Sequence, residues 1–162
     1  FHPKSRGSAR DWPLSNYRKL ADLLPEDTFD LHITGTKEEE AMILKEDPNF
    51  FKNSGFQNQT GKFSLEEFID FISNADGLIA CSTGPLHIAS SMGIFALGLY
   101  PPIRPMHPGR WAPLGLKSYF MTGKDNCQQC PEPSNCECMK LIEAENVAKM
   151  IISHFNFPNS HS

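Results

Sequence analysis

A turn that could bind an anion is the clearest chemical feature of this chain. Its sequence is STGPLH, at residues 82–87, and it follows an apolar run at residues 77–81. Thr83 supplies a hydroxyl, Gly84 lets a ligand approach the backbone, and Pro85 suits the first position of a helix. Because the N–H groups of a first helical turn have no partner within the helix, a phosphate bound there would satisfy them. The segment therefore predicts a strand-to-helix turn that binds phosphate.

His87 falls in the first turn of the expected helix. Either ring nitrogen could reach a phosphate or sugar oxygen bound at that end. For an isolated histidine, the ordinary interpretation is a satisfied residue at the edge of the core. The order of several other segments along the chain favours the ligand role instead.

Four segments together resemble glycosyltransferase family 9, the lipopolysaccharide heptosyltransferase-like enzymes. Residues 77–93 resemble its signature, in which a strand ends in a small-residue loop followed by Gly-Pro-x-His-x-Ala. Residues 1–14 resemble its His-Pro-Gly-Ser loop with a Trp-Pro-Leu helix start, and residues 34–39 its Gly-x-x-x-Glu turn. Residues 99–111 resemble a loop found in one branch of the family. Four motifs in the family's order are more specific than one.

The resemblance implies a GT-B fold, in which two Rossmann-like domains face each other across a cleft. Residues 1–162 would form one of them, a single nucleotide-sugar-binding domain that corresponds to the carboxy-terminal half. We expect the amino-terminal acceptor domain, which supplies the catalytic base in this family, to be absent. Residues 1–3 look like the end of a strand whose beginning is missing.

The activity implied by the resemblance is an inverting, metal-independent sugar transfer. Heptose or a related sugar would move from a nucleotide diphosphate, an ADP-sugar being favoured, to a lipopolysaccharide-like or lipid-linked glycan acceptor. This domain would stabilise the departing diphosphate, with no cofactor required, and would bind but not turn over when alone. The alternatives are a noncatalytic nucleotide- or phosphate-binding module and a metal-stabilised interaction domain.

The donor site implied by the resemblance is built from loops that follow successive strands. Helix N–H groups at residues 83–86 and nearby cations would offset the charge of the leaving diphosphate. A solvated surface loop is an equal alternative for Lys4, Arg6 and Arg10. The candidate donor-binding residues are Lys4, Ser5, Arg6, Ser8, Glu39, Ser82, Thr83, Gly84, Pro85, His87, Arg104 and Arg110.

Glu39 has two interpretations. A carboxylate just after a strand-end glycine can accept hydrogen bonds from a ribose. Three consecutive glutamates at residues 38–40 more often place favourable charge in a first helical turn and on a solvated face, and we favour that alternative.

Arg104, His107 and Arg110 occupy a proline-rich segment in which we expect no regular structure. They would form a stiff cationic rim that meets the donor or an acidic surface of the missing domain. Ser82 departs from the family pattern, because many heptosyltransferases have Asp at this position. That departure weakens the case for heptose as the sugar and leaves diphosphate binding intact.

Cys127, Cys130, Cys136 and Cys138 lie in a cysteine-rich loop at residues 122–140. Four thiolates at this spacing could form a tetrahedral structural zinc site. Reduced cysteines without a metal are the favoured alternative, and two disulfides would suit an oxidising compartment better. Cys81, at the end of an apolar strand, is expected to be a small buried hydrophobe rather than a nucleophile.

The whole chain has 162 residues, 40% hydrophobic content and a formal charge of −4, which suits one domain and argues against a general nucleic-acid binder. No apolar run approaches the ~20 residues that span a bilayer, and no signal-peptide pattern opens the chain. We expect a cytoplasmic protein, with peripheral contact at the inner membrane face left open.

The elements that must position these residues alternate between strand and helix patterns. This order favours an α/β fold with a doubly wound, mainly parallel sheet whose ligand contacts lie at the carboxyl ends of its strands. The polar connection at residues 47–62 has room for one short strand. The expected helices cover residues 13–24, 37–46, 64–74, 85–92 and 147–155, and the expected strands cover residues 29–34, 77–81, 94–100 and 117–121.

Overall fold

The computed structural model describes residues 1–5, 7, 9–52, 55–103, 107–123 and 137–155. Helices and strands alternate along most of the chain. The helices are α1 (Leu14–Leu23), α2 (Lys37–Glu46), α3 (Leu65–Ser73), α4 (Gly84–Ser91), α5 (Pro108–Trp111) and α6 (Ala144–Phe155). The strands are β1 (Leu31–Ile33), β2 (Phe56–Asn58), β3 (Gly77–Cys81), β4 (Phe95–Tyr100) and β5 (Ser118–Thr122).

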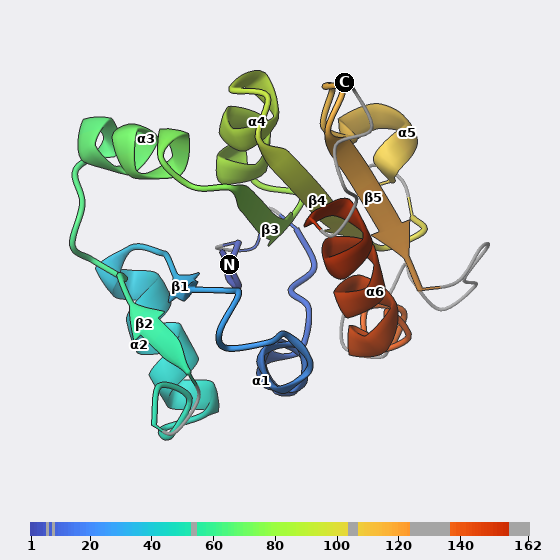
Figure 1. Ribbon diagram of the computed structural model, residues 1–162. Helices are drawn as coiled ribbons and strands as arrows, with labels where there is room; N and C mark the ends of the chain where they lie inside the picture. Colours follow the sequence, from blue (N-terminus) through green and yellow to red (C-terminus); the bar gives the residue numbers. More distant parts are fainter. Residues whose placement is uncertain (6, 8, 53–54, 104–106, 124–136, 156–162) are drawn as a thin grey trace.

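Parallel strands form the centre of the molecule (Figure 1). β1 pairs with β2, and β4 lies between β3 and β5, all in parallel register. The first residues of the chain join these two sets. The amino group of Phe1 donates to His32 O at 2.6 Å, and His2 N donates to Ile79 O at 2.9 Å. The doubly wound parallel arrangement expected from the sequence is confirmed. Residues 1–3, here called the central strand, link the two sets through an isolated parallel bridge between His2 and Ala80.

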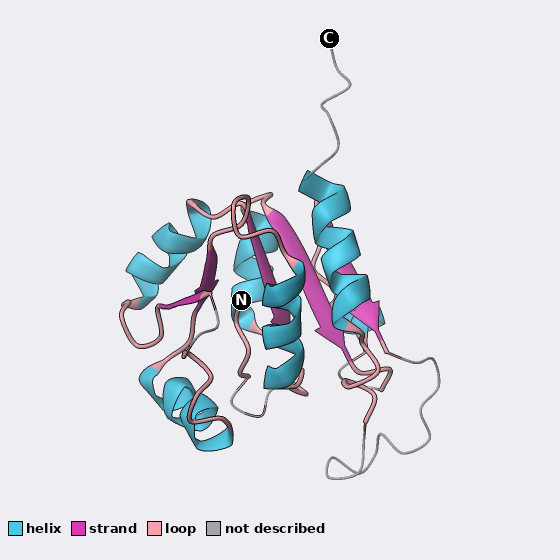
Figure 2. Ribbon diagram, turned by 60° about the horizontal axis from the view of Figure 1, so that its bottom comes forward, coloured by secondary structure: helices cyan, strands magenta, loops and turns pink. Residues whose placement is uncertain are grey.

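Helices cover both faces of this sheet (Figure 2). Side chains alternate along β3, so that Ile79 and Cys81 enter a large apolar cluster with residues of α1 and α6. Leu78 and Ala80 point the other way and pack with residues of α3 and α4. The sheet therefore has apolar side chains on both faces, as expected where helices cover both sides.

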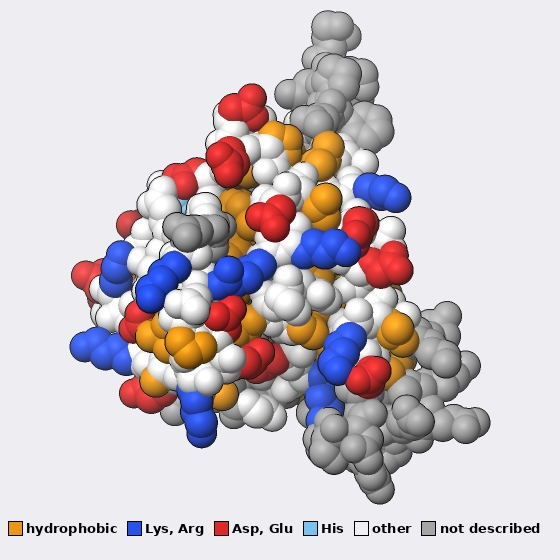
Figure 3. Space-filling model, turned by 90° about the horizontal axis from the view of Figure 1, so that it is seen from below, with side chains coloured by type: hydrophobic (Ala, Val, Ile, Leu, Met, Phe, Trp, Pro, Cys, Tyr) orange, Lys and Arg blue, Asp and Glu red, His pale blue; other side chains and the backbone are white. Residues whose placement is uncertain are grey.

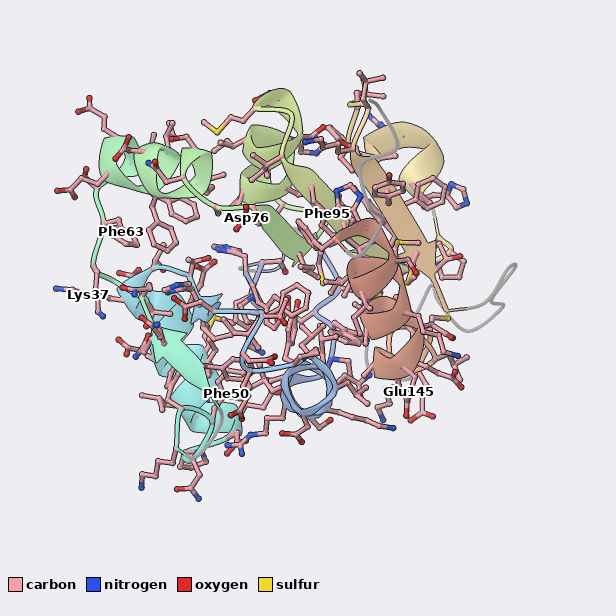
Figure 4. The ribbon with its side chains drawn as sticks, viewed as in Figure 1. Lys37, Phe50, Phe63, Asp76, Phe95 and Glu145 are labelled. Carbon is pink, nitrogen blue, oxygen red and sulfur yellow. The ribbon has the colours of Figure 1, made fainter. Side chains whose placement is uncertain are left out.

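Aromatic residues fill the larger of the two clusters. In Figure 4, Phe95 lies between the sheet and α6, and Phe50 lies near α1 and α2. The Phe95 ring centroid is 4.6 Å from that of His154, and the Phe50 centroid is 5.3 Å from that of Phe56. The first contact packs α6 against β4, and the second packs the segment after α2 against β2.

Local signals in the sequence set most helix boundaries. Thr36 and Ser64 each cap a helix through the reciprocal hydrogen bonds of a capping box, at α2 and α3 respectively. Gly93, with a φ of 73°, follows α4 in the left-handed conformation that glycine tolerates best. The helix expected around residues 37–46 is confirmed.

The expectation of no regular structure in the proline-rich segment was wrong. Residues 108–111 form the single turn α5. His107 caps it, because its Nδ1 accepts a hydrogen bond from Gly109 N at 2.9 Å, and Pro108 occupies the first helical turn. Proline there starts a helix rather than preventing one.

Charged side chains of both signs are interspersed on the face shown in Figure 3. That face, as far as its residues are described, has no broad basic field of the kind that follows a nucleic-acid backbone. Within the described ranges, no helix combines the length and apolar character needed to cross a membrane.

The central strand should make stability depend on pH. In a polypeptide that consists of residues 1–162 alone, burial lowers the pKa of the Phe1 amino group to about 5, and burial together with that neighbouring charge lowers the pKa of His2 to about 4. The unfolded chain keeps these protons up to the ordinary pKa values, so between the folded and unfolded values it binds more protons than the folded chain. The free energy of unfolding should therefore rise with pH, by up to about 1.4 kcal/mol per unit for each group.

Urea denaturation between pH 5 and 8 would measure this slope. Acetylating the Phe1 amino group should remove its contribution between pH ~5 and ~8, and His2→Asn should remove the contribution of His2, which lies below pH ~6.5. A free energy of unfolding that stays constant over this range in the unmodified chain would contradict the buried, neutral state of both groups.

Candidate functional site

The carboxyl ends of the parallel strands lie at one edge of the sheet, and the loops that leave them carry most of the predicted site residues. Lys4 and Ser5 follow the central strand, Thr34 and Gly35 follow β1, and Ser82 follows β3. This is the edge at which ligands bind in open α/β sheets. The topology therefore gathers residues that are far apart in sequence.

Residues 82–87, here called the α4 turn, connect β3 to α4 as the sequence predicted. Thr83 is the capping residue, but its side chain makes no capping hydrogen bond. It is only 8% exposed, and its Oγ1 is a buried polar atom without a hydrogen-bond partner among the described residues. A buried polar group left unpaired costs about 1–3 kcal/mol, which a bound acceptor would recover.

The backbone at the α4 turn offers fewer donors than the sequence suggested. Pro85 has no N–H, and Leu86 N donates to Thr83 O at 3.2 Å. Gly84 is the first residue of α4, so its N–H has no partner within the helix. A Cβ at Gly84 would meet no described atom within 4 Å, so the space beside it is open. The Gly84 N–H and the Thr83 hydroxyl are thus the two donors on which an anion would depend.

His87 is half-buried in the first turn of α4. No hydrogen bond or ion pair is recorded for its ring within the described part of the chain. The predicted position beside the α4 turn is confirmed, and its role toward a ligand stays a prediction.

Lys4 is placed differently from our expectation. It is 5% exposed, and its Nζ lies 2.5 Å from Glu46 Oε2 and 3.3 Å from Asp11 Oδ2. Two carboxylates therefore balance its charge inside the protein. We leave Lys4 out of the phosphate site for this reason.

Ser5 also makes its hydrogen bonds within its own loop. Its hydroxyl lies 2.7 Å from Asp11 Oδ1 and 3.0 Å from Ala9 O, which are alternative acceptors for one proton. Arg10 lies half-buried in the same loop. Arg6 and Ser8 lie outside the described residues.

Glu39 lies in the first turn of α2, as we favoured, but it is buried rather than on a solvated face, and it caps the helix. Its Oε2 accepts a hydrogen bond from Thr36 N at 2.7 Å, and its own N–H donates to Thr36 Oγ1 at 3.2 Å. The carboxylate is 4% exposed and lies 3.7 Å from His2 Nε2. One carboxylate oxygen is thus taken by the start of α2, and contact with a ribose stays a prediction.

The cationic rim is described in part, since Arg104 lies outside the described residues. Arg110 is exposed, and its guanidinium carbon lies 5.3 Å from the centroid of the Trp111 ring. The Trp111 carbonyl accepts a hydrogen bond from the Tyr100 hydroxyl. The segment that carries Arg110 is therefore attached to the end of β4.

Tyr100 is a site residue that the sequence analysis missed. Burial raises the pKa of its hydroxyl to about 12, partly offset by a hydrogen bond with Ser82. The residue looks like an ordinary strand aromatic in the sequence. Its position as the last residue of a parallel strand was the available signal.

The cysteine prediction falls mostly outside the described part of the chain. Cys127, Cys130 and Cys136 are not described, and Cys138 is buried. Among the described residues, no cluster of three or more metal-binding side chains occurs, so zinc binding by the four cysteines stays a prediction. Burial raises the pKa of Cys81 to about 12, which supports the expectation of a structural residue rather than a nucleophile.

A cavity of about 560 Å³ lies at the other ends of the strands. Its walls include Phe1, Leu31, Gly77 and Phe95, which begin the central strand, β1, β3 and β4. The cavity is therefore separate from the α4 turn, which follows the carboxyl end of β3.

Comparison with known proteins gives consistent matches. The model of glycosyltransferase family 9 (heptosyltransferase) matches residues 1–140. A "Putative glycosyltransferase" of Haemophilus influenzae is 35% identical over 118 residues, which are 70% of this chain and 33% of the relative. "Lipooligosaccharide heptosyltransferase 2" of the same organism is 28% identical over 107 residues, which are 62% of this chain and 30% of the relative. The chain thus spans about a third of the length of these relatives.

Solved structures show the same fold. A glycosyl transferase family 9 protein from Veillonella parvula aligns with a TM-score of 0.73 and 20% identity, over 93% of this chain and 43% of that chain. The E. coli heptosyltransferase WaaC with ADP aligns with a TM-score of 0.71 and 17% identity, over 94% of this chain and 42% of that chain. The folded unit described here therefore corresponds to less than half of either structure.

Replacing Thr83 by Val should separate stability from binding. Valine keeps the shape and removes the unpaired hydroxyl, so the free energy of unfolding without ligand should rise by about 1 kcal/mol. Thr60 is the matched control, because it is equally buried but its Oγ1 donates to Asn58 Oδ1 at 2.6 Å. Thr60→Val should lower stability by about 1 kcal/mol.

Chemical denaturation of both variants provides the measurement. A Thr83→Val variant as destabilised as Thr60→Val would mean that the Thr83 hydroxyl has a partner inside the protein, and the case for a vacant anion donor would fail.

Proposed function

Because this chain belongs to glycosyltransferase family 9, we propose that it is the donor-binding part of an inverting glycosyltransferase. The intact enzyme would transfer heptose or a related sugar from a nucleotide diphosphate, an ADP-sugar in our proposal, to a lipopolysaccharide-like glycan. The observation that carries the proposal is the buried Thr83 hydroxyl, which has no hydrogen-bond partner among the described residues. Thr83 precedes α4 at the ligand-binding edge of the sheet, and its side chain makes no capping hydrogen bond.

In this proposal the α4 turn binds the diphosphate. The Thr83 hydroxyl and the Gly84 N–H donate to phosphate oxygens, and the positive end of the α4 dipole adds to their effect. His87 lies in the same turn and donates a further hydrogen bond from its ring. All three groups are held by a helix and a buried strand, so little reorganisation is needed as charge develops on the departing diphosphate.

The other half of the reaction belongs to polypeptide beyond this domain. Transfer to a glycan hydroxyl requires a base that removes its proton while the donor bond breaks. We propose that the base and the acceptor-binding surface lie in the remaining part of the intact protein, since this chain spans about a third of its relatives. No cofactor is part of this proposal.

Calorimetric titration with ADP and adenosine tests the donor site. We expect ADP to bind residues 1–162 at least about tenfold more tightly than adenosine, because the site is proposed to bind phosphate. Thr83→Val should weaken binding of ADP and leave binding of adenosine unchanged, and titrations with UDP and GDP would identify the preferred base. Equal affinities for ADP and adenosine would reject the phosphate site.

Turnover should need more than this domain. We expect no sugar transfer from ADP-heptose by residues 1–162, and transfer once the remaining domain is supplied, in an assay that follows release of ADP. Acceptor-dependent release of ADP by the isolated domain would show that the base lies within this chain. If the reconstituted protein binds ADP but stays inactive, a noncatalytic binding module is the better interpretation.

A further inference from the structure

We propose that Tyr100 is a positioning residue, whose hydroxyl fastens α5 to the α4 turn so that Arg110 is held within reach of the donor phosphates. This inference rests on the proposed phosphate site.

The Tyr100 ring occupies the space that Gly98 leaves on its strand. Tyr100 is fully buried, and its ring folds back over Gly98, the residue two positions earlier on the same face of β4. A Cβ at Gly98 would collide with Cε2 of this ring and lie 2.9 Å from Leu86 Cδ2 of α4. A glycine within a strand is unfavourable unless something must approach closely, and here the tyrosine ring does. The position of the ring between β4 and α4 is therefore built into the fold.

Tyr100 links both loops. Its hydroxyl donates to Trp111 O, and its ring packs in one apolar cluster with Leu86 of the α4 turn. Arg110, the residue before Trp111, is therefore carried by a segment that Tyr100 ties to the α4 turn.

Arg110 is available for this task. Its side chain is exposed beside the Trp111 ring, and no carboxylate forms an ion pair with it among the described residues. Lys4 differs, because two carboxylates already hold it. Of these two predicted donor-site cations, Arg110 is the one whose charge could bind a phosphate. Its contribution depends on how firmly α5 is held.

A double-mutant cycle tests the inference. Tyr100→Phe keeps the ring packed over Gly98 and removes only the hydroxyl, and Arg110→Gln removes the cation. Each should weaken binding of ADP by about fivefold to tenfold and leave binding of adenosine unchanged. The double variant should bind ADP no more weakly than Arg110→Gln alone, since both changes remove the same contact. Tyr119→Phe, at an exposed tyrosine of β5, is the control and should change neither affinity.

The outcomes separate this inference from the proposed function. If the unaltered chain binds ADP and adenosine equally, the phosphate site itself is wrong. If it prefers ADP but Tyr100→Phe has no effect, or if the two substitutions weaken binding independently, the positioning role is wrong. Circular dichroism shows whether Tyr100→Phe is folded. Should it not fold, unchanged ADP affinity in Arg110→Gln would overturn the inference.

Discussion

Parallel hydrogen bonding of residues 1–3 between β1 and β3 is the interaction on which the rest of the structure depends. Phe1 pairs with β1 through His32 and Thr34, and His2 pairs with β3 through Ile79. Without these bonds, the described strands would be two separate sheets. With them, every strand end lies at the same edge, which brings the α4 turn, the loop after Lys4 and the end of β4 together. The burial of His2 is a cost of this arrangement.

The buried polar residues at this edge are of two kinds, those with a hydrogen-bond or ion-pair partner and those without one among the described residues. Lys4, Ser5 and Glu39 are buried, and each has a partner that holds a loop or a helix start in place. Thr83 is buried and lacks such a partner among the described residues. A folded protein tolerates an unpaired buried hydroxyl at a cost, so its position at the start of α4 indicates a group kept for a ligand. This contrast, more than the presence of polar residues as such, supports the donor site.

Local patterns in the sequence predicted much of the fold, and tertiary contacts account for what they missed. The helices expected near residues 37 and 64 begin there, and the capping boxes at Thr36 and Ser64 explain why, because such motifs act within four residues. The ion pair between Lys4 and Glu46 joins residues 42 positions apart, which no local pattern indicates. The single turn α5 is too short to show a helical period. Tyr100 could not be singled out, since its role depends on contacts with Trp111 and Leu86 in two other segments.

The location of bound ADP tests the central claim most directly. Amide chemical shifts of residues 1–162, measured by NMR during titration with ADP, would show which part of the sheet the diphosphate contacts. We predict the largest changes at Thr83, Gly84 and His87, with adenosine producing smaller changes there. Changes confined to the residues around the cavity at the amino ends of the strands, with the α4 turn unaffected, would contradict a donor site at the α4 turn.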